Sequence, residues 1–162
     1  MVVIYNPVDL EQLDLAYLAF FLGRRVNELV VHRLQQAGFT NVRESHGYVI
    51  QYLIGGERSI TDLSRRMGVT QQAASKTVAD MIRQGVLEAT PAADRRTKTI
   101  RISKRGWESV QFARRARTRI DSRLATMMSA ESHERTKASL IRCIRALGGV
   151  KQIRSRRVRE PR

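Results

Sequence analysis

The sequence has one cysteine, few acidic residues and no long apolar run. Cys143 has no second cysteine to pair with, so the chain forms no internal disulfide, which agrees with a reducing compartment. A bilayer span needs about 18 to 20 apolar residues, and Arg24, Arg25 and Glu28 interrupt the richest stretch, residues 15–31. The first residues also lack the basic start and cleavage site of a secretory signal. We therefore expect a cytoplasmic protein that does not insert into a membrane.

Motifs for catalysis and for metal binding are also missing from the sequence. The chain contains no glycine-rich phosphate loop, no nucleophile elbow and no His-Glu-x-x-His pair. His32, His46 and His133 lie far apart and have no cysteine or carboxylate companions at ligand spacing. We expect no metal site, no cofactor and no enzymatic activity.

Positive charge is what the chain has in excess. It carries 30 Lys and Arg residues against 15 Asp and Glu residues, a formal net charge of +15. A field of this size attracts polyanions and speeds their encounter with the protein. Arginine also offers a planar fork of donors that matches phosphate and guanine. Double-stranded DNA is therefore the expected partner, and an anionic membrane surface is the alternative.

The N-terminal part of the chain predicts one long helix over residues 8–37, with Asp9 as its N-cap and Gly38 as its stop. Its apolar residues fall on more than one face of the helix. Such a helix must be buried on more than one face, which a small domain seldom achieves without a partner chain. The sequence therefore predicts a homodimer in which this helix forms part of the interface.

The C-terminal part predicts two further helices and a basic arm. Ser103 begins a long helix that reaches about residue 128, and a final helix follows over residues 132–147. Residues 149–162 are expected to form an arm with almost nothing to bury, because six of the last twelve residues are basic. We assign residues 8–38 and 104–148 to a helical dimerisation region.

The central residues 41–103 predict short helices followed by a hairpin, the layout of a winged helix-turn-helix DNA-binding domain. Gly68 turns the chain between two of the helices, and Gly85 ends the last one. The expected elements are helices at 41–54, 59–67 and 71–84 and strands at 86–89 and 99–102. The predicted fold class is mainly α with a small β-hairpin wing, a winged helix-turn-helix flanked by N- and C-terminal dimerisation helices.

The helix at 71–84 has the character of a recognition helix that enters the major groove. Ala74, Val78, Met81 and Ile82 form its expected inward stripe. Glutamine can bond adenine edges in pairs, serine can donate or accept, and lysine reaches guanine or phosphate. The residues predicted to contact DNA here are Thr70, Gln71, Gln72, Ser75 and Lys76. Any solvated helix face can carry such side chains, so the neighbouring turn and hairpin are what favour DNA.

The predicted hairpin has a basic tip, formed by Asp94, Arg95, Arg96 and Lys98. A cation on an extended hairpin can enter the minor groove, where narrow A·T-rich tracts concentrate negative potential. The aspartate is expected to hold an arginine in position. The alternative is a hairpin tip that charge merely keeps soluble.

Four segments in one order resemble the MarR family of bacterial regulators. They are ITDLSRRMGVTQQAASKTV at 60–78, GVLE at 85–88, DRR at 94–96 and ISKRG at 102–106. The resemblance covers about residues 60–106, and the helix order on both sides agrees. It implies a homodimer whose first and last helices form the interface, and it implies an Asp-x-Arg wing motif in which Arg96 enters the minor groove. Ile102 and Ser103 depart mildly from the family's Leu-Thr-x-x-Gly element.

The resemblance also implies a regulatory activity. Members of the family usually repress by occupying a near-palindromic operator, and many release it when a small phenolic or lipophilic ligand binds between the dimerisation and DNA-binding parts. The residues that the resemblance places in such a ligand site are Tyr17, Phe20, Phe21, His46, Tyr48 and Trp107. Aromatic residues at helical spacing are more often core than pocket, which is the alternative interpretation here.

Three further alternatives remain open at this point. A sequence-tolerant architectural DNA-binding protein would also use the high charge and the basic arm. A regulator of the same fold could act without any ligand, through its abundance alone. Cys143 lies among arginines that could lower its pKa for redox sensing, but a small apolar interface residue is the simpler interpretation.

Overall fold

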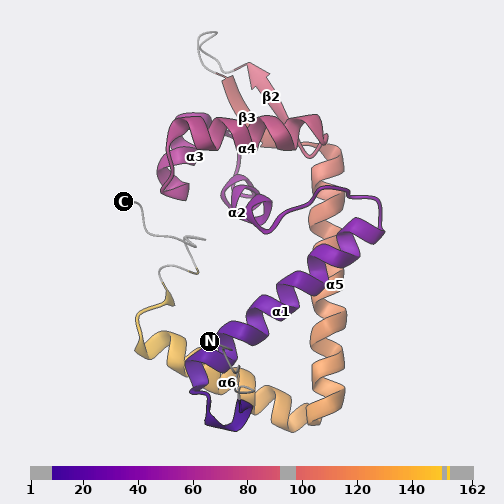
Figure 1. The fold of residues 1–162 in the computed structure, drawn as a ribbon, viewed down its shortest axis with the longest axis vertical. Coiled ribbons are helices and arrows are strands. Elements are labelled where there is room, and N and C mark those ends of the chain that lie inside the picture. Colours follow the sequence, from indigo (N-terminus) through magenta and orange to yellow (C-terminus); the bar gives the residue numbers. More distant parts are fainter. Residues whose placement is uncertain (1–8, 92–97, 151–152, 154–162) are drawn as a thin grey trace, which may run out of the picture.

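The protein is a helical molecule with one small sheet, seen in a computed structural model that describes residues 9–91, 98–150 and 153 (Figure 1). Its helices are α1 (Leu15–Gln36), α2 (Glu44–Leu53), α3 (Ile60–Met67), α4 (Gln71–Arg83), α5 (Lys104–Met128) and α6 (Ala130–Ala146). Its strands are β1 (Arg58–Ser59), β2 (Leu87–Pro91) and β3 (Lys98–Ile102), and a 3-10 helix, η1, spans Leu10–Gln12. The mainly α fold with a β-hairpin wing that the sequence predicts is confirmed.

Helix α5 connects the two ends of the molecule (Figure 1). The short helices α2 to α4 and the sheet lie at one end, and α6 lies at the other. Helix α1 crosses α5 and packs against it. Among the described helices, none combines the length and the apolar character needed to cross a membrane.

The first helix begins later than the sequence predicts. The Asp9 carboxylate accepts the Glu11 N–H at 3.1 Å, but the element that it caps is the 3-10 helix. Leu13 is then extended, and the Asp14 carboxylate accepts the Tyr17 N–H at 2.8 Å as the N-cap of α1. The prediction of one helix from residue 8 is therefore wrong in its first turns, because a second aspartate restarts the helix. Gly38, with φ of +85°, ends it as predicted.

Helix α2 also begins later than predicted, at Glu44 instead of residue 41. Asn41 has a φ of 60°, a left-handed conformation that a helix cannot include. Helix α6 begins two residues before the predicted start, because the Ser129 hydroxyl accepts the Ser132 N–H at 3.3 Å. The N-caps of α3, α4 and α5 are Ser59, Thr70 and Ser103, so these helices begin within one residue of their predicted starts.

The sheet has three antiparallel strands in the order β1-β3-β2. The predicted hairpin is β2 and β3, with Leu87 opposite Ile102. Strand β1 was missed, because two residues are too few to show an alternating pattern, and it pairs Arg58 with Ile100. The Glu57 carboxylate beside β1 accepts from the hydroxyls of Thr90 at 2.9 Å and Thr99 at 3.0 Å, which fixes the hairpin to the helical domain.

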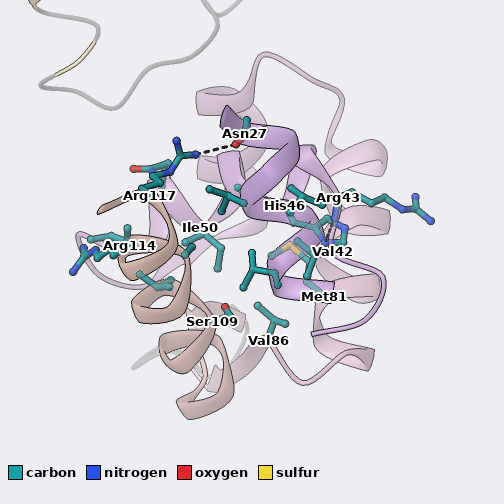
Figure 2. A pocket seen from close by; sticks show the side chains of 18 residues that line it. Asn27, Val42, Arg43, His46, Ile50, Met81, Val86, Ser109, Arg114 and Arg117 are labelled. Carbon is teal, nitrogen blue, oxygen red and sulfur yellow. Dashed lines mark hydrogen bonds between the residues drawn. The ribbon is translucent and has the colours of Figure 1, made fainter. Parts of the chain in front are cut away.

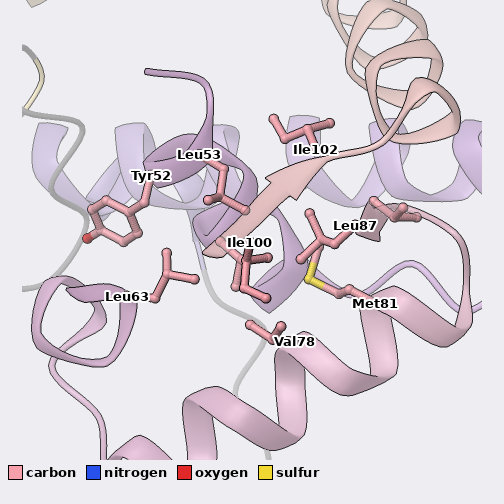
Figure 3. Close-up of a cluster of buried hydrophobic side chains, with 10 residues drawn as sticks. Tyr52, Leu53, Leu63, Val78, Met81, Leu87, Ile100 and Ile102 are labelled. Atoms are coloured by element: carbon pink, nitrogen blue, oxygen red, sulfur yellow. The ribbon is translucent and has the colours of Figure 1, made fainter. Parts of the chain in front are cut away.

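Two apolar clusters hold the fold together. The larger lies between α2, α3, α4 and the sheet (Figure 3). Its buried members are Val49, Tyr52, Leu53, Leu63, Val78, Met81, Val86, Leu87, Ile100 and Ile102. The smaller joins Val30 and Leu34 of α1 to Ala116 of α5 where these helices cross.

The start of α5 approaches the hairpin so closely that only glycine fits there. A Cβ atom on Gly106 would lie 2.1 Å from the Val86 carbonyl oxygen and 2.7 Å from Cγ2 of Ile102. The Ser103 hydroxyl caps α5 by accepting the Gly106 N–H at 3.0 Å, and the Ser103 N–H donates to the same Val86 oxygen at 3.1 Å. The long helix is thereby fixed directly to the wing.

Candidate nucleic-acid interface and adjoining pocket

Helix α4 is anchored to the domain core along one side. Ala74, Val78 and Met81 are at most 1% exposed, so this side of the helix is fixed. Gly68, with φ of 63°, provides the left-handed turn from α3, and the Thr70 hydroxyl accepts the Ala73 N–H at 3.2 Å. Ile82, which the sequence places inward, is 36% exposed, so the buried stripe ends at Met81.

The opposite side of α4 is polar and accessible. Gln72, Ser75, Lys76 and Ala79 follow the spacing of one helix face, with Gln71 beside them in the first turn. Gln71, Gln72 and Lys76 are exposed, and Ser75 is half-buried. Within the described part of the chain, the side chains of these four residues form no hydrogen bond. The predicted major-groove residues therefore lie together with their donors and acceptors available.

The wing is described only in part. Lys98 is exposed at the start of β3, and farther along this strand Arg101 pairs with Glu88 of β2 at 2.6 Å. The predicted minor-groove residues Asp94, Arg95 and Arg96 lie outside the described residues. The hairpin that leads to them stands beside α4 at the same end of the molecule (Figure 1).

A cavity of about 320 Å³ lies behind α4, between α1, α2, α4 and α5 (Figure 2). Its apolar lining comes from all four helices and from residues that flank them, such as Val42 before α2 and Val86 before β2. These residues are Val30, Val31, Leu34, Val42, Ile50, Ile54, Met81, Val86, Val110 and Ala113. Its polar lining is Asn27, Arg43, His46, Gln51, Ser109, Arg114 and Arg117. A volume near 300 Å³ is at the lower end of the range for small-molecule sites.

His46 connects this cavity to helix α4. Its side chain is 7% exposed, and its Nε2 lies 3.6 Å from Oδ2 of Asp80 on α4. Its Nδ1 accepts the backbone N–H of Arg43 at 3.4 Å, which requires the neutral ring with its proton on Nε2. Burial lowers the pKa of His46, and this outweighs the opposing effect of the nearby Asp80 carboxylate. Asp80 in turn accepts from Arg83 at 3.1 Å.

The aromatic residues implied as ligand contacts are not brought together here. His46 lines the cavity, whereas Tyr17, Phe21, Tyr48 and Trp107 are not among its lining residues. Tyr17 and Phe21 contact each other on the exposed N-terminal half of α1, with ring centroids 5.7 Å apart. Trp107 is 38% exposed. Sequence reasoning missed the aliphatic lining, because the cavity arises where α1 crosses α5, and no local pattern encodes that crossing.

Comparison with known proteins finds a family that the central part of the chain matches. A model described as MarR family matches residues 38–97, which include α2, α3, α4 and the first strand of the wing. A search of the curated proteins finds no match for the chain.

Solved structures share the fold. MepR, a transcription regulator of a multidrug efflux pump in Staphylococcus aureus, matches with a TM-score of 0.68 at 18% identity over 83% of this chain and 99% of that chain. A MepR variant bound to an oligodeoxyribonucleotide matches with a TM-score of 0.63 at 18% identity, over 84% and 99%. Apo MarR from E. coli gives 0.65 at 13% identity, over 86% and 99%.

A ligand-bound regulator has the same architecture. RdhR, described as an organohalide-sensing transcriptional regulator, matches in its 2,4-dichlorophenol-bound form with a TM-score of 0.52 at 17% identity, over 90% of this chain and 89% of that chain. At these identities the structural likeness establishes the fold, and the sequence match to the family covers residues 38–97. Residues 38–97 thus match the MarR family, and the chain has the winged helix-turn-helix fold of the regulators MepR and MarR.

Proposed function

We propose that the protein represses transcription as a homodimer bound to a near-palindromic operator. The observation that carries this proposal is the face of α4, where Gln71, Gln72 and Lys76 are exposed on a helix whose other side is fixed in the core. A related fold, that of the MepR variant, is bound to an oligodeoxyribonucleotide in its crystal structure. Two copies of α4 about 34 Å apart would enter successive major grooves on one side of the duplex.

Apolar side chains exposed at the end of the molecule away from α4 support the homodimer. On α1, Leu15 and Phe20 are each 62% exposed, and beyond α6 Leu147 is 87% exposed. Both segments lie at this end (Figure 1). A soluble monomer seldom exposes so much apolar surface in one region, and a second copy related by a two-fold axis would cover it. We therefore assign dimerisation to residues 8–38 and 104–148, and DNA binding to residues 41–103.

The wing and the basic arm extend the proposed DNA contact. Lys98, Arg95 and Arg96 would follow the minor groove beside each half-site, with Asp94 orienting Arg96. Residues 149–162 would add contacts to phosphate that do not depend on sequence. The proposal requires that the protein meets DNA in the cytoplasm, as the sequence predicts.

The cavity behind α4 is the proposed site of control. Met81 belongs both to the cavity lining and to the buried side of α4, and His46 contacts Asp80 of the same helix. A small molecule in the cavity would therefore shift the position of α4 relative to the core. In the proposed dimer this shift would change the distance between the two recognition helices. RdhR, whose fold is similar, has been crystallised with 2,4-dichlorophenol bound.

Selection of genomic DNA fragments by the purified protein, at moderate and at high salt, tests this function. A specific regulator enriches a few two-fold symmetric sites and prefers them to random duplex by roughly a thousandfold or more. Gln72→Ala should change the base preference within each half-site, whereas Gln111→Ala, on the exposed surface of α5, should not. Even coverage that disappears at high salt would refute the proposal and favour a sequence-tolerant architectural protein.

A further inference from the structure

Most of the positive charge of the chain lies outside its winged part. Residues 41–103 contain ten Lys and Arg residues against six Asp and Glu residues. Helix α5 alone contains seven basic residues against two acidic ones, and residues 129–162 contain ten against three. An operator held by α4 and the wing makes no use of this second excess. The proposed function therefore leaves the charge of α5 unexplained.

The middle of α5 carries a row of three exposed arginines. Arg115, Arg119 and Arg123 follow one another at four-residue spacing, so they lie beside one another on successive turns of the helix. We call these three residues the arginine row. Like charges at this spacing repel each other and lower the stability of a helix. The row therefore costs folding free energy, and a bound anion would offset that cost.

The described part of the chain does not neutralise the arginine row. Among the residues that the structure describes, none of the three arginines forms an ion pair. Asp121, the acidic residue of α5 within this segment, instead lies with its Oδ1 3.0 Å from Nε2 of His133 on α6. The guanidinium group of Arg115 lies over the ring of Phe112, 6.0 Å from its centroid, which restricts the side chain without occupying its N–H donors. The row thus presents positive charge and hydrogen-bond donors to a partner.

The arginine row lies away from the surface that would meet an operator. Helix α5 leads from the wing, beside α4, to α6 at the other end of the molecule (Figure 1). A rise of about 1.5 Å per residue places the row about 17 to 29 Å along the helix from its start at Lys104. A duplex on α4 would have to bend sharply to touch the row, which costs free energy because duplex DNA is stiff. A separate anionic molecule or segment reaches the row without that bend.

The chemistry of this surface favours duplex DNA as the partner. Arginine matches phosphate oxygens with two parallel N–H donors. The residues that neighbour the row at helical spacing are Gln111, Thr118 and Ser122, which are polar and exposed, so the surface offers no apolar side chains to insert into a membrane. A duplex is straight over the length of the row, whereas an acidic peptide or a single strand loses conformational entropy when it follows a straight helix. Duplex DNA is also present at high local concentration wherever the protein occupies an operator.

We propose that the arginine row binds the phosphate backbone of a second DNA duplex, so that the protein bridges an operator on α4 and a separate segment of DNA. The contact is made to phosphates and does not depend on sequence. This inference rests on the proposed function in one respect, namely that α4 and the wing hold the first duplex. It adds a further function to that of an operator-binding regulator, because a bridging protein brings distant segments of one DNA molecule together.

Capture of a second duplex tests the proposal. The full-length protein is bound to an immobilised operator duplex obtained from the genomic selection, until α4 and the wing are saturated. A labelled short duplex of unrelated sequence is then added. The parent protein should retain the labelled duplex at low salt, and retention should fall steeply as salt is added, because bound phosphates release counterions.

Variants of α5 locate the second duplex. Arg115→Gln combined with Arg119→Gln should lower the affinity for the labelled duplex roughly tenfold, and should lower the slope of log affinity against log salt by about 1.8, or about 0.9 for each lost phosphate contact. The affinity for the operator duplex should stay unchanged. Arg135→Gln combined with Lys137→Gln removes the same two charges from α6, where each side chain already pairs with a glutamate of its own helix, at 3.9 and 3.4 Å. This control should capture the labelled duplex as well as the parent does.

Three results would overturn the proposal. The first is no capture by the parent protein at low salt, and the second is an equal loss of capture in both double variants, which would show an effect of net charge alone. The third is displacement of the labelled duplex by single-stranded RNA or by polyglutamate more effectively than by unlabelled duplex, at equal concentration of charge.

The same measurements separate this inference from the proposed function. If the protein selects specific genomic sites but captures no second duplex, the proposed function stands and bridging fails. If the selection finds no specific site but an unrelated duplex binds with a salt slope that the α5 double variant lowers, the surface on α5 stands and the proposed function fails.

Discussion

Replacing Gly106 by alanine should destabilise the protein by about 2 kcal/mol. The added Cβ would lie 2.1 Å from a backbone oxygen, that of Val86, well short of the 3.4 Å at which ordinary contact begins. Overpacking of this kind costs about 1–3 kcal/mol. Moving the Val86 carbonyl also weakens its hydrogen bond with the Ser103 N–H, which adds about 1 kcal/mol to the destabilisation. The higher helix propensity of alanine offsets about 1 kcal/mol of this destabilisation.

Gly47→Ala is the matched control for this prediction. Gly47 lies within α2, and a Cβ there meets nothing within 4 Å, so alanine should stabilise the protein by about 0.5–1 kcal/mol. Both variants are compared with the parent by urea unfolding at one protein concentration, because the proposed dimerisation would make stability depend on concentration. If Gly106→Ala unfolds at the same urea concentration as the parent or at a higher one, the contact between α5 and the hairpin is not as close as described.

Three further perturbations test other parts of the structure. Thr70→Ala removes the N-cap of α4 and should cost about 1 kcal/mol in urea unfolding, whereas Thr70→Ser should cost much less. The pKa of His46 lies below its ordinary value of 6.5, so the folded state resists protonation of this ring, and the free energy of unfolding should be greatest above about pH 6.5 and decrease below it. Urea unfolding at a series of pH values should show a smaller decrease for His46→Gln than for the parent. An equal decrease in both proteins would contradict the burial of this ring. Phe20→Glu adds a charge to the exposed apolar end of α1 and should shift sedimentation from dimer toward monomer, while Gln71→Glu, at the exposed start of α4 and outside the proposed dimerisation region, should leave the dimer intact.

Local signals in the sequence located most of the elements of the fold. The starts of α3, α4 and α5 were predicted to within one residue. Their N-cap hydroxyls, on Ser59, Thr70 and Ser103, act on backbone N–H groups three residues away, so the signal is contained in the local sequence. Where two such signals compete, local reasoning fails: Asp9 and Asp14 are both good caps, and the structure uses Asp14 for α1.

Features that depend on distant contacts could not be predicted. Strand β1 exists because Arg58 pairs with Ile100, more than forty residues away in the chain. The polar face of α4 was predicted, since the helical period determines which residues face outward together. The cavity behind it was not, because Asn27 and Arg117 meet only after α1 has crossed α5. The helical period places Ile82 in the inward stripe, but Ile82 is exposed because the core ends at Met81.

Because α5 is one uninterrupted helix, insertions or deletions within it would change the relative orientation of its two ends. An α-helix turns by about 100° and rises about 1.5 Å for each residue. Deleting one residue from the middle of α5 would therefore rotate the wing and α4 by about 100° around the α5 axis, relative to α6, even if every side-chain contact at both ends survived. In the proposed dimer, the two copies of α4 rotated in this way would no longer face the same side of a duplex. The number of residues in α5 thus determines the orientation of the wing and α4 relative to α6. Loops elsewhere should tolerate insertions that this helix does not.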